Sequence, residues 1–386
     1  MKAVGRAALA LLLATSLGAQ HAPPRRPRLD AGVDTNAAGA YYALGLRTIE
    51  HDPTRAADAF YWATRLDPSY ADAWYGRWAA LLLAQPPHVL DDYIIGIPSI
   101  VRSPEIQRID SLRREAFLRE PLLPLRLEGT MVSVWLERAT GGDATLLSVE
   151  SARQDPWTRG WLAYARGRYA DATRYFAFAL QRHPQAIDIH EDRARAFIPL
   201  LQYDSAIAEL QVMLDSIRGR ESERLEHVYS SNAMTEYTIG RIAEIRGDTA
   251  TARTRYAVAL VGDLAFYRGH MALGRLALFR GDSTESLAEY DLAVELAPTD
   301  PNARYEYGLA LFNARHFLDA AEQFRQAIAT DSDFVAPYYP LAYLMDNTGQ
   351  DSLAIACYRE FVRRAPHSAA AQVAVAKGRL AELAGH

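Results

Sequence analysis

The sequence predicts an all-α protein, an α-solenoid of stacked helix–turn–helix units that one irregular insertion interrupts. The first observation is self-similarity, because residues 304–366 align with themselves at a shift of 34 residues, which pairs Gly308 with Ala342 and Phe324 with Tyr358. The second is that prolines recur at the ends of several units. A fixed period of about 20–50 residues is typical of solenoids, in which each unit buries its apolar face only by stacking on its neighbours.

The composition is that of an ordinary globular chain. Of 386 residues, 49% are hydrophobic and 23% are charged, and the formal net charge is -5. Such a mild charge gives no electrostatic reason to expect nucleic acid or an anionic membrane as a partner. A single cysteine, Cys357, excludes an intramolecular disulfide and a thiolate metal site, and we expect it to be a small buried side chain.

The N-terminal residues have the pattern of a secretory signal peptide. Lys2 and Arg6 supply a positive end before an apolar run at 7–15, and small residues at 16–19 offer a cleavage site. This run is shorter than the roughly 20 apolar residues that span a bilayer, and no later stretch is apolar enough to do so. We therefore expect residues 1–19 to be removed and the chain to be exported, to the periplasm or to an extracellular or envelope-associated location.

The repeats are predicted to begin soon after this leader. Residues 20–34 are rich in proline and arginine and are predicted to be a flexible linker. Residues 35–84 are predicted to form the N-terminal repeat helices, with Gly45 in the first helix, Phe60 in the second and Trp74 near the start of a third.

Residues 85–152 break the period and are interpreted as a degenerate repeat or insertion. β-branched and aromatic residues at 91–101 favour an irregular or extended segment. A serine cap, a proline at the first helical position and a glutamate in the first turn predict a helix over 103–119. Residues 122–139 and 143–151 are predicted to be a degenerate helix pair.

The regular array is predicted to occupy residues 153–368 and to end in a capping helix at 369–386. Its six units are 153–186, 187–220, about 233–266, 267–300, 301–334 and 335–368.

This spacing resembles that of the tetratricopeptide repeat family, whose units read W-x2-L-G-x2-Y and then A-x3-F-x2-A-x4-P. The resemblance covers roughly residues 35–84 and 153–368, and it implies a right-handed superhelix. Small residues let the two helices of a unit approach closely, at Gly160, Gly240, Gly274 and Gly308. An aromatic residue of the second helix then fills the space, and prolines at 68, 184, 298 and 366 end second helices.

The motifs of common enzymes and cofactor sites are missing, namely the phosphate-binding, dinucleotide-binding, zinc-protease, nucleophile-elbow and haem-attachment patterns. We therefore predict no catalytic residue, cofactor or metal. The cluster His190-Glu191-Asp192 lies at the start of a helix, where its members point in different directions. The triplet Arg246-Gly247-Asp248 is interpreted as a turn, because the next unit has Arg280-Gly281-Asp282 at the same place.

In the family that this chain resembles, the first helix of each unit lines the concave face of the superhelix. Carried over residue by residue, the resemblance implies a partner-binding face that is rich in aromatic residues, with arginine and asparagine among them. Its members are Trp157, Trp161, Tyr164, Tyr237, Arg241, Arg275, Phe279, Tyr305, Phe312, Asn313, Tyr339, Tyr343 and Asn347. Glu191, Arg195, Glu244, Met271, Leu309 and Asp346 are expected on the same face.

The leading functional prediction is a non-enzymatic protein–protein interaction scaffold of the cell envelope. It would bind a peptide or a partner protein in the concave groove, where aromatic residues and arginine are the usual anchors. Two alternatives remain open. One is a glycan-binding or accessory subunit of an envelope or secretion complex, with Trp157, Trp161 and Tyr164 stacking on sugar. The other is an enzyme whose site lies in residues 85–152.

Overall fold

The computed structural model describes residues 24–86 (without 50 and 69), 104–123, 156–221 (without 166), 229–365 (without 333) and 369–383. Over these residues the chain forms helices and no strand, which confirms the predicted all-α fold. The helices are α2 (Ala38–Thr48), α3 (Pro53–Leu66), α4 (Ala71–Leu83), α6 (Pro104–Arg119), α9 (Pro156–Ala165), α10 (Tyr169–Arg182), α11 (Ile187–Phe197), α12 (Tyr203–Glu221), α13 (Tyr229–Ile245), α14 (Thr249–Gly262), α15 (Tyr267–Phe279), α16 (Ser283–Leu296), α17 (Pro301–Asn313), α18 (Phe317–Thr330), α19 (Tyr338–Asn347), α20 (Asp351–Arg364) and α21 (Ala370–Leu383).

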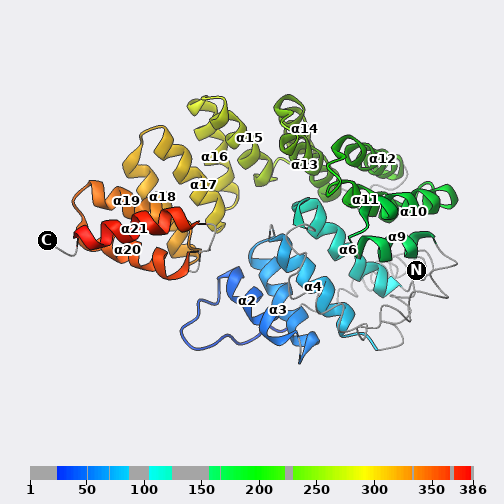
Figure 1. Ribbon diagram of the computed structural model, residues 1–386, viewed down its shortest axis with the longest axis horizontal. Coiled ribbons are helices and arrows are strands. Elements are labelled where there is room, and N and C mark those ends of the chain that lie inside the picture. The colour runs from blue at the N-terminus through cyan, green and yellow to red at the C-terminus, as the bar shows by residue number, and fades with distance from the viewer. Residues whose placement is uncertain are drawn as a thin grey trace, which may run out of the picture.

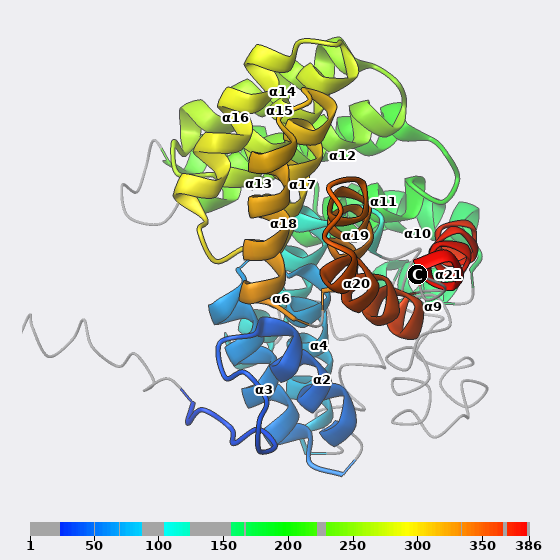
Figure 2. The same ribbon diagram turned by 90° about the vertical axis from the view of Figure 1, so that its left-hand side faces the viewer.

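Neighbouring helices pack in pairs, and each pair packs on the next (Figure 1). The pairs are α2–α3, α9–α10, α11–α12, α13–α14, α15–α16, α17–α18 and α19–α20. The array curves as it proceeds, so that α2 to α4 lie opposite α15 to α18 (Figures 1 and 2). This is the predicted solenoid.

Close packing within several pairs depends on glycine in the first helix. A Cβ atom added to Gly240 would lie 2.6 Å from the Tyr256 ring, and one added to Gly308 would lie 2.6 Å from the Phe324 ring. Both rings are fully buried. The second helix can approach only because the first helix has no side chain at that position, which confirms the predicted role of these glycines.

Aspartates and prolines set the helix ends as the sequence indicates. The Asp248 and Asp282 side chains accept hydrogen bonds from the backbone N–H groups three residues later, which caps α14 and α16. Asp300 caps α17 in the same way and precedes Pro301 at the first helical position. α16 ends at Leu296, two residues before Pro298.

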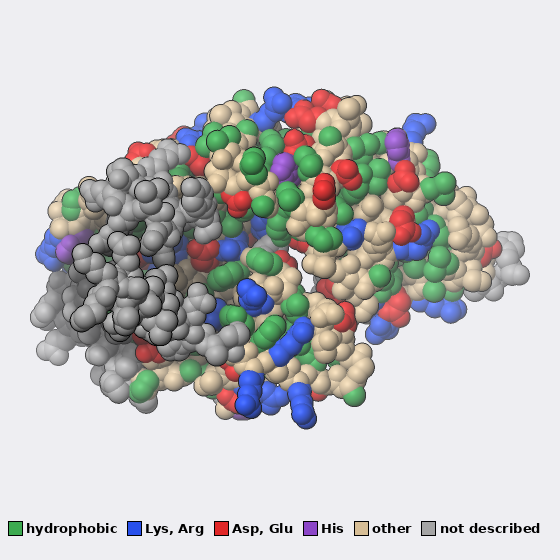
Figure 3. Space-filling view, turned by 180° about the vertical axis from the view of Figure 1, so that it is seen from behind, with side chains coloured by type: hydrophobic (Ala, Val, Ile, Leu, Met, Phe, Trp, Pro, Cys, Tyr) green, Lys and Arg blue, Asp and Glu red, His purple; other side chains and the backbone are tan. Residues whose placement is uncertain are grey.

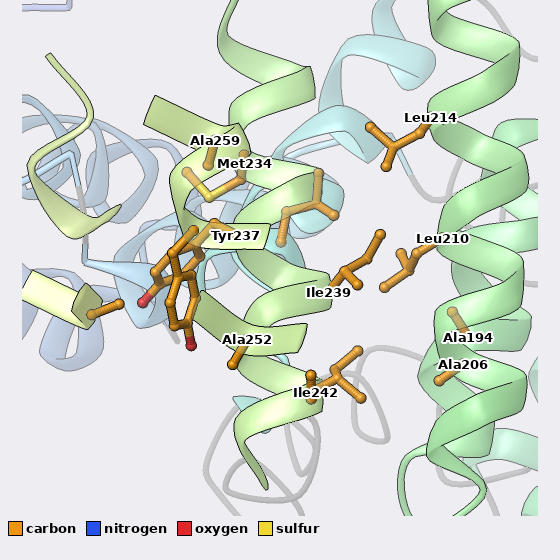
Figure 4. Close-up of a cluster of buried hydrophobic side chains, with 14 of the residues drawn as sticks. Ala194, Ala206, Leu210, Leu214, Met234, Tyr237, Ile239, Ile242, Ala252 and Ala259 are labelled. Carbon is orange, nitrogen blue, oxygen red and sulfur yellow. The ribbon is translucent and has the colours of Figure 1, made fainter. Parts of the chain in front are cut away.

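Figure 4 shows a large core cluster, where side chains of consecutive units interlock. Leu210 and Leu214 of α12 point toward Ile239 and Ile242 of α13 (Figure 4). All four side chains are 0% exposed, so the stacking of one unit on the next excludes water from their interface.

The turn between the two helices of a unit requires a left-handed backbone conformation. Gly247 and Gly281 supply it with φ of 85° and 78°. Leu201 and Arg315 occupy the equivalent turns with φ of 58° and 64°. A side chain with a Cβ atom is strained in this region, so these two turns carry a conformational cost that glycine does not.

We expect Leu201→Gly to increase the free energy of unfolding by about 0.5–1 kcal/mol, because relief of the strain exceeds the entropy that glycine adds to the unfolded chain. Urea denaturation followed by circular dichroism measures the change. Gly281→Ala is the opposite control, since it introduces the same strain and should destabilise the chain by a similar amount. A Leu201→Gly variant that is less stable than the parent would contradict this reading of the turn.

Within residues 85–152, the predicted helix is confirmed as α6, Pro104–Arg119. The predicted extended segment at 91–101 and the degenerate helix pair at 122–151 lie outside the described residues, apart from 122 and 123. α6 packs against α4 and also contacts α11 and α13. It therefore joins the N-terminal helices to the middle of the array (Figure 1).

The described part of the predicted linker is attached to the first unit. The Trp62 indole N–H donates to the Pro24 carbonyl at 3.1 Å. The Arg26 guanidinium lies over the Trp62 ring and donates to the Tyr41 hydroxyl at 2.8 Å. The flexibility of residues 20–34 stays a prediction, and the predicted signal peptide, residues 1–19, lies outside the described residues.

The N-terminal unit also approaches the C-terminal part of the array. A Cβ atom added to Gly39 of α2 would lie 3.7 Å from a carboxylate oxygen of Asp331, in the loop that follows α18. Burial raises the pKa of Tyr70, at the start of α4, and the charge of Asp331 is among the charges that raise it further. The superhelix thus turns far enough to bring α2 and α4 close to the loop that follows α18 (Figure 2). Among the described helices, none has the length and apolar character needed to cross a membrane.

Candidate protein-interaction surface

The residues predicted to bind a partner lie on the first helices of the units, α9, α11, α13, α15, α17 and α19. We call the side of the superhelix formed by these helices the concave face. The structure divides it into two parts. α6 covers the part formed by α9, α11 and α13, and the part formed by α15, α17 and α19 has exposed side chains.

Asp192 of α11 is the centre of the covered part. Its carboxylate accepts hydrogen bonds from the indole N–H groups of Trp157 at 3.0 Å and Trp161 at 2.9 Å. The Arg113 guanidinium of α6 lies 3.1 Å from the same carboxylate and 4.5 Å from the centre of the Trp161 ring. Trp157 is only 4% exposed. The predicted tryptophan platform is therefore occupied by α6 of the same chain.

Other residues of α6 complete this covered part. Arg114 forms ion pairs with Asp188 and with Glu191, and the Glu191 carboxylate also pairs with Arg195. The Arg195 guanidinium lies over the Phe117 ring, 4.9 Å from its centre. The acidic residues of α11 are thus neutralised by arginines of α6 and α11.

α6 continues onto α13 with its last turn. The Thr238 hydroxyl donates a hydrogen bond to the Leu118 carbonyl of α6. Tyr237 is 7% exposed and packs on the Tyr256 and Phe266 rings at 5.5 and 5.4 Å. Tyr237, predicted to face a partner, is thus a core residue here. We call the concave face of α9, α11 and α13 the filled segment.

Beside the filled segment, an ion-pair network crosses from α13 to α17. The Arg275 guanidinium donates twice to Glu244, at 2.9 Å each, and Arg241 lies 3.2 Å from the same carboxylate. Arg275 also lies 3.7 Å from Glu306. Burial alone would raise the pKa of Glu244, but the hydrogen bond and charge of Arg275 hold it below its usual range. Arg241 and Arg275, predicted as partner contacts, are thus already paired within the chain.

The remaining predicted residues form what we call the open segment, on α15, α17 and α19. Phe279 is 78% exposed and Tyr343 is 46% exposed, and Phe312 lies between α17 and α19 with its ring centre 6.0 Å from that of Tyr343. The side chains of Asn313 and Asn347 are exposed, and each donates to a carbonyl one turn earlier, at 2.8 and 2.7 Å. Each amide oxygen therefore remains available as an acceptor.

Three of the predicted residues pack on aromatic rings of the same chain. Tyr305 packs on the Phe334 ring at 5.5 Å and Tyr339 packs on the Phe361 ring at 5.1 Å. Tyr164, on α9, packs on the Tyr169 ring at 5.3 Å. All three side chains are half-buried, so only part of each ring is exposed to a partner.

Sequence reasoning missed the partner of the filled segment. Two arginines, Arg113 and Arg114, one turn before Phe117 and Leu118, were a signal that α6 carries both charge and apolar surface. Nothing in the repeat period indicated that α6 would pack on α11 and α13. The pairing of Asp346 on the concave face with Arg379 of α21, at 2.7 Å, was missed for the same reason.

The His190-Glu191-Asp192 cluster has the divergent geometry that its helical spacing predicts. His190 turns toward Glu209 of α12, with Nδ1 2.5 Å from the carboxylate, and its Nε2 lies 2.9 Å from the Pro184 carbonyl oxygen. In the described parts of the chain no three histidine, cysteine or acidic residues are grouped in a way that could hold a metal ion. The cysteine, Cys357, is buried, and burial raises the pKa of its thiol to about 11.

The His190 geometry favours the charged imidazolium. Both partners are acceptors, so both ring nitrogens must carry a proton. Burial alone would lower the pKa of His190, but its hydrogen bonds to Glu209 and Pro184 raise it above the usual value. A raised pKa stabilises the folded state below the unfolded pKa of about 6.5, and this stabilisation is lost as the pH rises through the folded value.

We therefore expect the stability that His190 provides, measured against His190→Asn, to be about 1 kcal/mol greater at pH 5.5 than at pH 8.5. Urea denaturation of both proteins at the two pH values measures the difference. His316 is the control, because its side chain is 52% exposed and lies 3.7 Å from Asp319. His316→Asn removes an exposed histidine, and an equal dependence of stability on pH for the two substitutions would contradict the assignment.

Comparison with known proteins agrees with the repeat geometry. A sequence model of the tetratricopeptide repeat family matches residues 158–220, 237–301 and 271–334. Over these residues the chain resembles tetratricopeptide repeats. The matched residues hold α10, α11 and α14 to α18 and parts of α9, α12 and α13, so they lie in both the filled segment and the open segment.

One curated relative shares this repeat sequence. The chain is 27% identical over 176 residues to human tetratricopeptide repeat protein 13, and the match covers 45% of this chain and 19% of that protein. The match therefore spans less than a fifth of the relative's length.

Solved tetratricopeptide repeat structures resemble this one at low identity. The C-terminal part of a repeat protein from Cytophaga hutchinsonii is 16% identical with a TM-score of 0.46, covering 59% of this chain and 88% of that one. A repeat protein from Parabacteroides merdae is 15% identical with a TM-score of 0.41, covering 70% and 99%. YrrB, described as a tetratricopeptide repeat protein with an unusual peptide-binding site, is 17% identical with a TM-score of 0.36, covering 50% and 93%.

Proposed function

We propose that this chain is a non-enzymatic interaction scaffold of the cell envelope and that it binds a peptide or a segment of a partner protein on the open segment of its concave face. The observation that carries the proposal is the contrast between the two parts of that face. α6 fills one part with arginine and phenylalanine side chains, and the other part presents the exposed Phe279 and Tyr343. Tetratricopeptide repeats generally mediate protein–protein interactions, and large exposed aromatic side chains on a repeat surface support binding.

The way α6 packs on the filled segment supports a peptide as the ligand of the open segment. α6 uses apolar side chains, Phe117 and Leu118, and places arginines against carboxylates. The open segment offers Phe312 and Tyr343 for apolar contact, and the free amide oxygens of Asn313 and Asn347 for hydrogen bonds from a peptide backbone. A short segment with one or two apolar anchors fits this combination of groups.

The experiment uses a displayed library of random peptides, 12 residues long, selected on the full chain. Peptides that are enriched are synthesised and their affinity is measured by fluorescence anisotropy. We expect Phe312→Ala combined with Tyr343→Ala to weaken binding about tenfold or more, as loss of an aromatic anchor does. Trp157→Phe is the matched control on the filled segment, and it should leave the affinity unchanged. Selection of no peptide, or equal binding by the double variant, would refute the binding surface.

The proposed export rests on the sequence of residues 1–19 alone. A fusion of residues 1–40 to alkaline phosphatase, an enzyme that is active only after export from the bacterial cytoplasm, tests it. Activity that is lost when Leu11, Leu12 and Leu13 are each replaced by aspartate supports export. Activity that persists in this variant, or no activity at all, would refute it.

A further inference from the structure

The turn between α17 and α18 departs from the pattern of the two preceding units. Those turns read Arg246-Gly247-Asp248 and Arg280-Gly281-Asp282, with glycine in the left-handed region and aspartate as the helix cap. The third reads Ala314-Arg315-His316. Arg315 holds the left-handed conformation at φ 64°, and the His316 side chain makes no capping hydrogen bond. Two local sources of stability are therefore missing at one turn, and such departures concentrate at functional positions.

Exposed apolar side chains surround this turn. Phe317 is 45% exposed and Leu318 is 82% exposed, although both follow the turn directly at the start of α18. The Phe312 ring lies 5.5 Å from that of Phe317. Phe279 precedes Asn313 by 34 residues, one repeat. It therefore lies in the preceding unit at the position that Asn313 occupies in this one, two residues before the left-handed residue of the turn. We call Phe279, Phe312, Arg315, Phe317 and Leu318 the turn-edge patch.

The charge of the patch comes from Arg315. Its side chain is exposed, and within the described residues its guanidinium makes no hydrogen bond or ion pair. The arginines of the two preceding turns differ in this respect, because Arg280 pairs with Glu285 at 2.6 Å and Arg246 pairs with Asp204. Arg315 therefore presents a positive charge beside apolar surface, where a ligand carboxylate would gain the most from pairing with it.

We propose that the turn-edge patch binds an acidic–apolar segment of a partner protein, with a carboxylate of that segment on Arg315 and an apolar side chain on Phe317 and Leu318. This inference rests on the proposed scaffold function, because Phe312 joins the patch to the open segment. A protein fits better than an anionic membrane, because the turn-edge patch carries a single arginine, whereas anionic lipid surfaces are recognised by clusters of several lysines or arginines. The strain at Arg315 is then the cost of placing a cation where glycine would serve the fold better.

The test uses the same 12-residue library on the full chain, followed by affinity measurements with synthetic peptides. We expect enriched peptides to combine aspartate or glutamate with leucine or an aromatic residue. Arg315→Gly should weaken their binding about tenfold while the melting temperature stays the same or rises, so that misfolding cannot explain the loss. Selection on Arg315→Glu should instead enrich lysine or arginine beside the same apolar residues.

The outcomes separate this inference from the proposed function. Peptides that bind with equal affinity to the parent, Arg315→Gly and Arg315→Glu would overturn the acidic partner and leave the scaffold function intact. Selection of no peptide by any of the proteins would overturn both. Vesicles of phosphatidylglycerol and phosphatidylcholine form the second arm: the expected result is no binding, and binding that is lost in Leu318→Ser would overturn the protein partner in favour of a lipid surface.

Discussion

Replacing Asp192 by alanine is expected to reduce the free energy of unfolding by about 3–5 kcal/mol, because the substitution removes the partner of a buried arginine. The side chains of Arg113 and Asp192 are 4% and 2% exposed. The same carboxylate also accepts from the indole groups of Trp157 and Trp161. Arg195, which is 7% exposed, also pairs with this carboxylate at 3.2 Å. The loss of Asp192 therefore leaves two arginines and two indole N–H groups buried without this acceptor. Urea denaturation followed by tryptophan fluorescence measures the effect.

Asp188→Ala is the matched control for Asp192→Ala. Asp188 pairs with Arg114 on the same two helices, but the two side chains are 28% and 30% exposed. Partly exposed pairs contribute about 0–1 kcal/mol. Replacing both Arg113 and Asp192 by leucine should recover part of the stability lost in Asp192→Ala, since Arg113 no longer lies buried beside a missing carboxylate, whereas the two indole N–H groups still lack this acceptor. Equal, small effects of Asp192→Ala and Asp188→Ala would show that α6 is not held by the buried pair.

The repeat period predicted the architecture because its physical causes are local. Gly308 and Phe324 are separated by one helical hairpin, and their contact recurs wherever the same spacing recurs. Capping by Asp248 and Asp282 is local in the same sense. The helix at 103–119 was predicted from its own start signals, which involve only neighbouring residues.

The state of the concave face was not predictable in this way. Its side chains were assigned to the correct helices, but whether a side chain is open depends on what covers it. Arg114 and Glu191 are 77 residues apart in the chain, and Thr238 lies 120 residues from Leu118. No period in the sequence connects these residues. The resemblance to a repeat family implied a continuous groove, and the nonperiodic α6 divides that groove into a filled and an open segment.

The packing of one helix on another gives the second large expected effect, at Gly308. Gly308→Ala should reduce the free energy of unfolding by about 1–2 kcal/mol, because the new methyl group would lie 2.6 Å from the buried Phe324 ring. Alanine is favoured over glycine inside a helix by about 1 kcal/mol, so any loss of stability must come from this contact. Urea denaturation of the variant and its parent measures the difference.

Gly378 of α21 supplies the control that separates helix propensity from packing. A Cβ atom added there meets nothing within 4 Å, so Gly378→Ala should gain stability from propensity alone, by about 0.5–1 kcal/mol. Phe324→Leu in the Gly308→Ala background should cost less than Phe324→Leu in the parent, since the smaller side chain makes room for the methyl group. If Gly308→Ala increases stability as Gly378→Ala does, the Phe324 ring leaves room for a methyl group at residue 308. The close approach of the two helices in the fifth unit would then not require glycine.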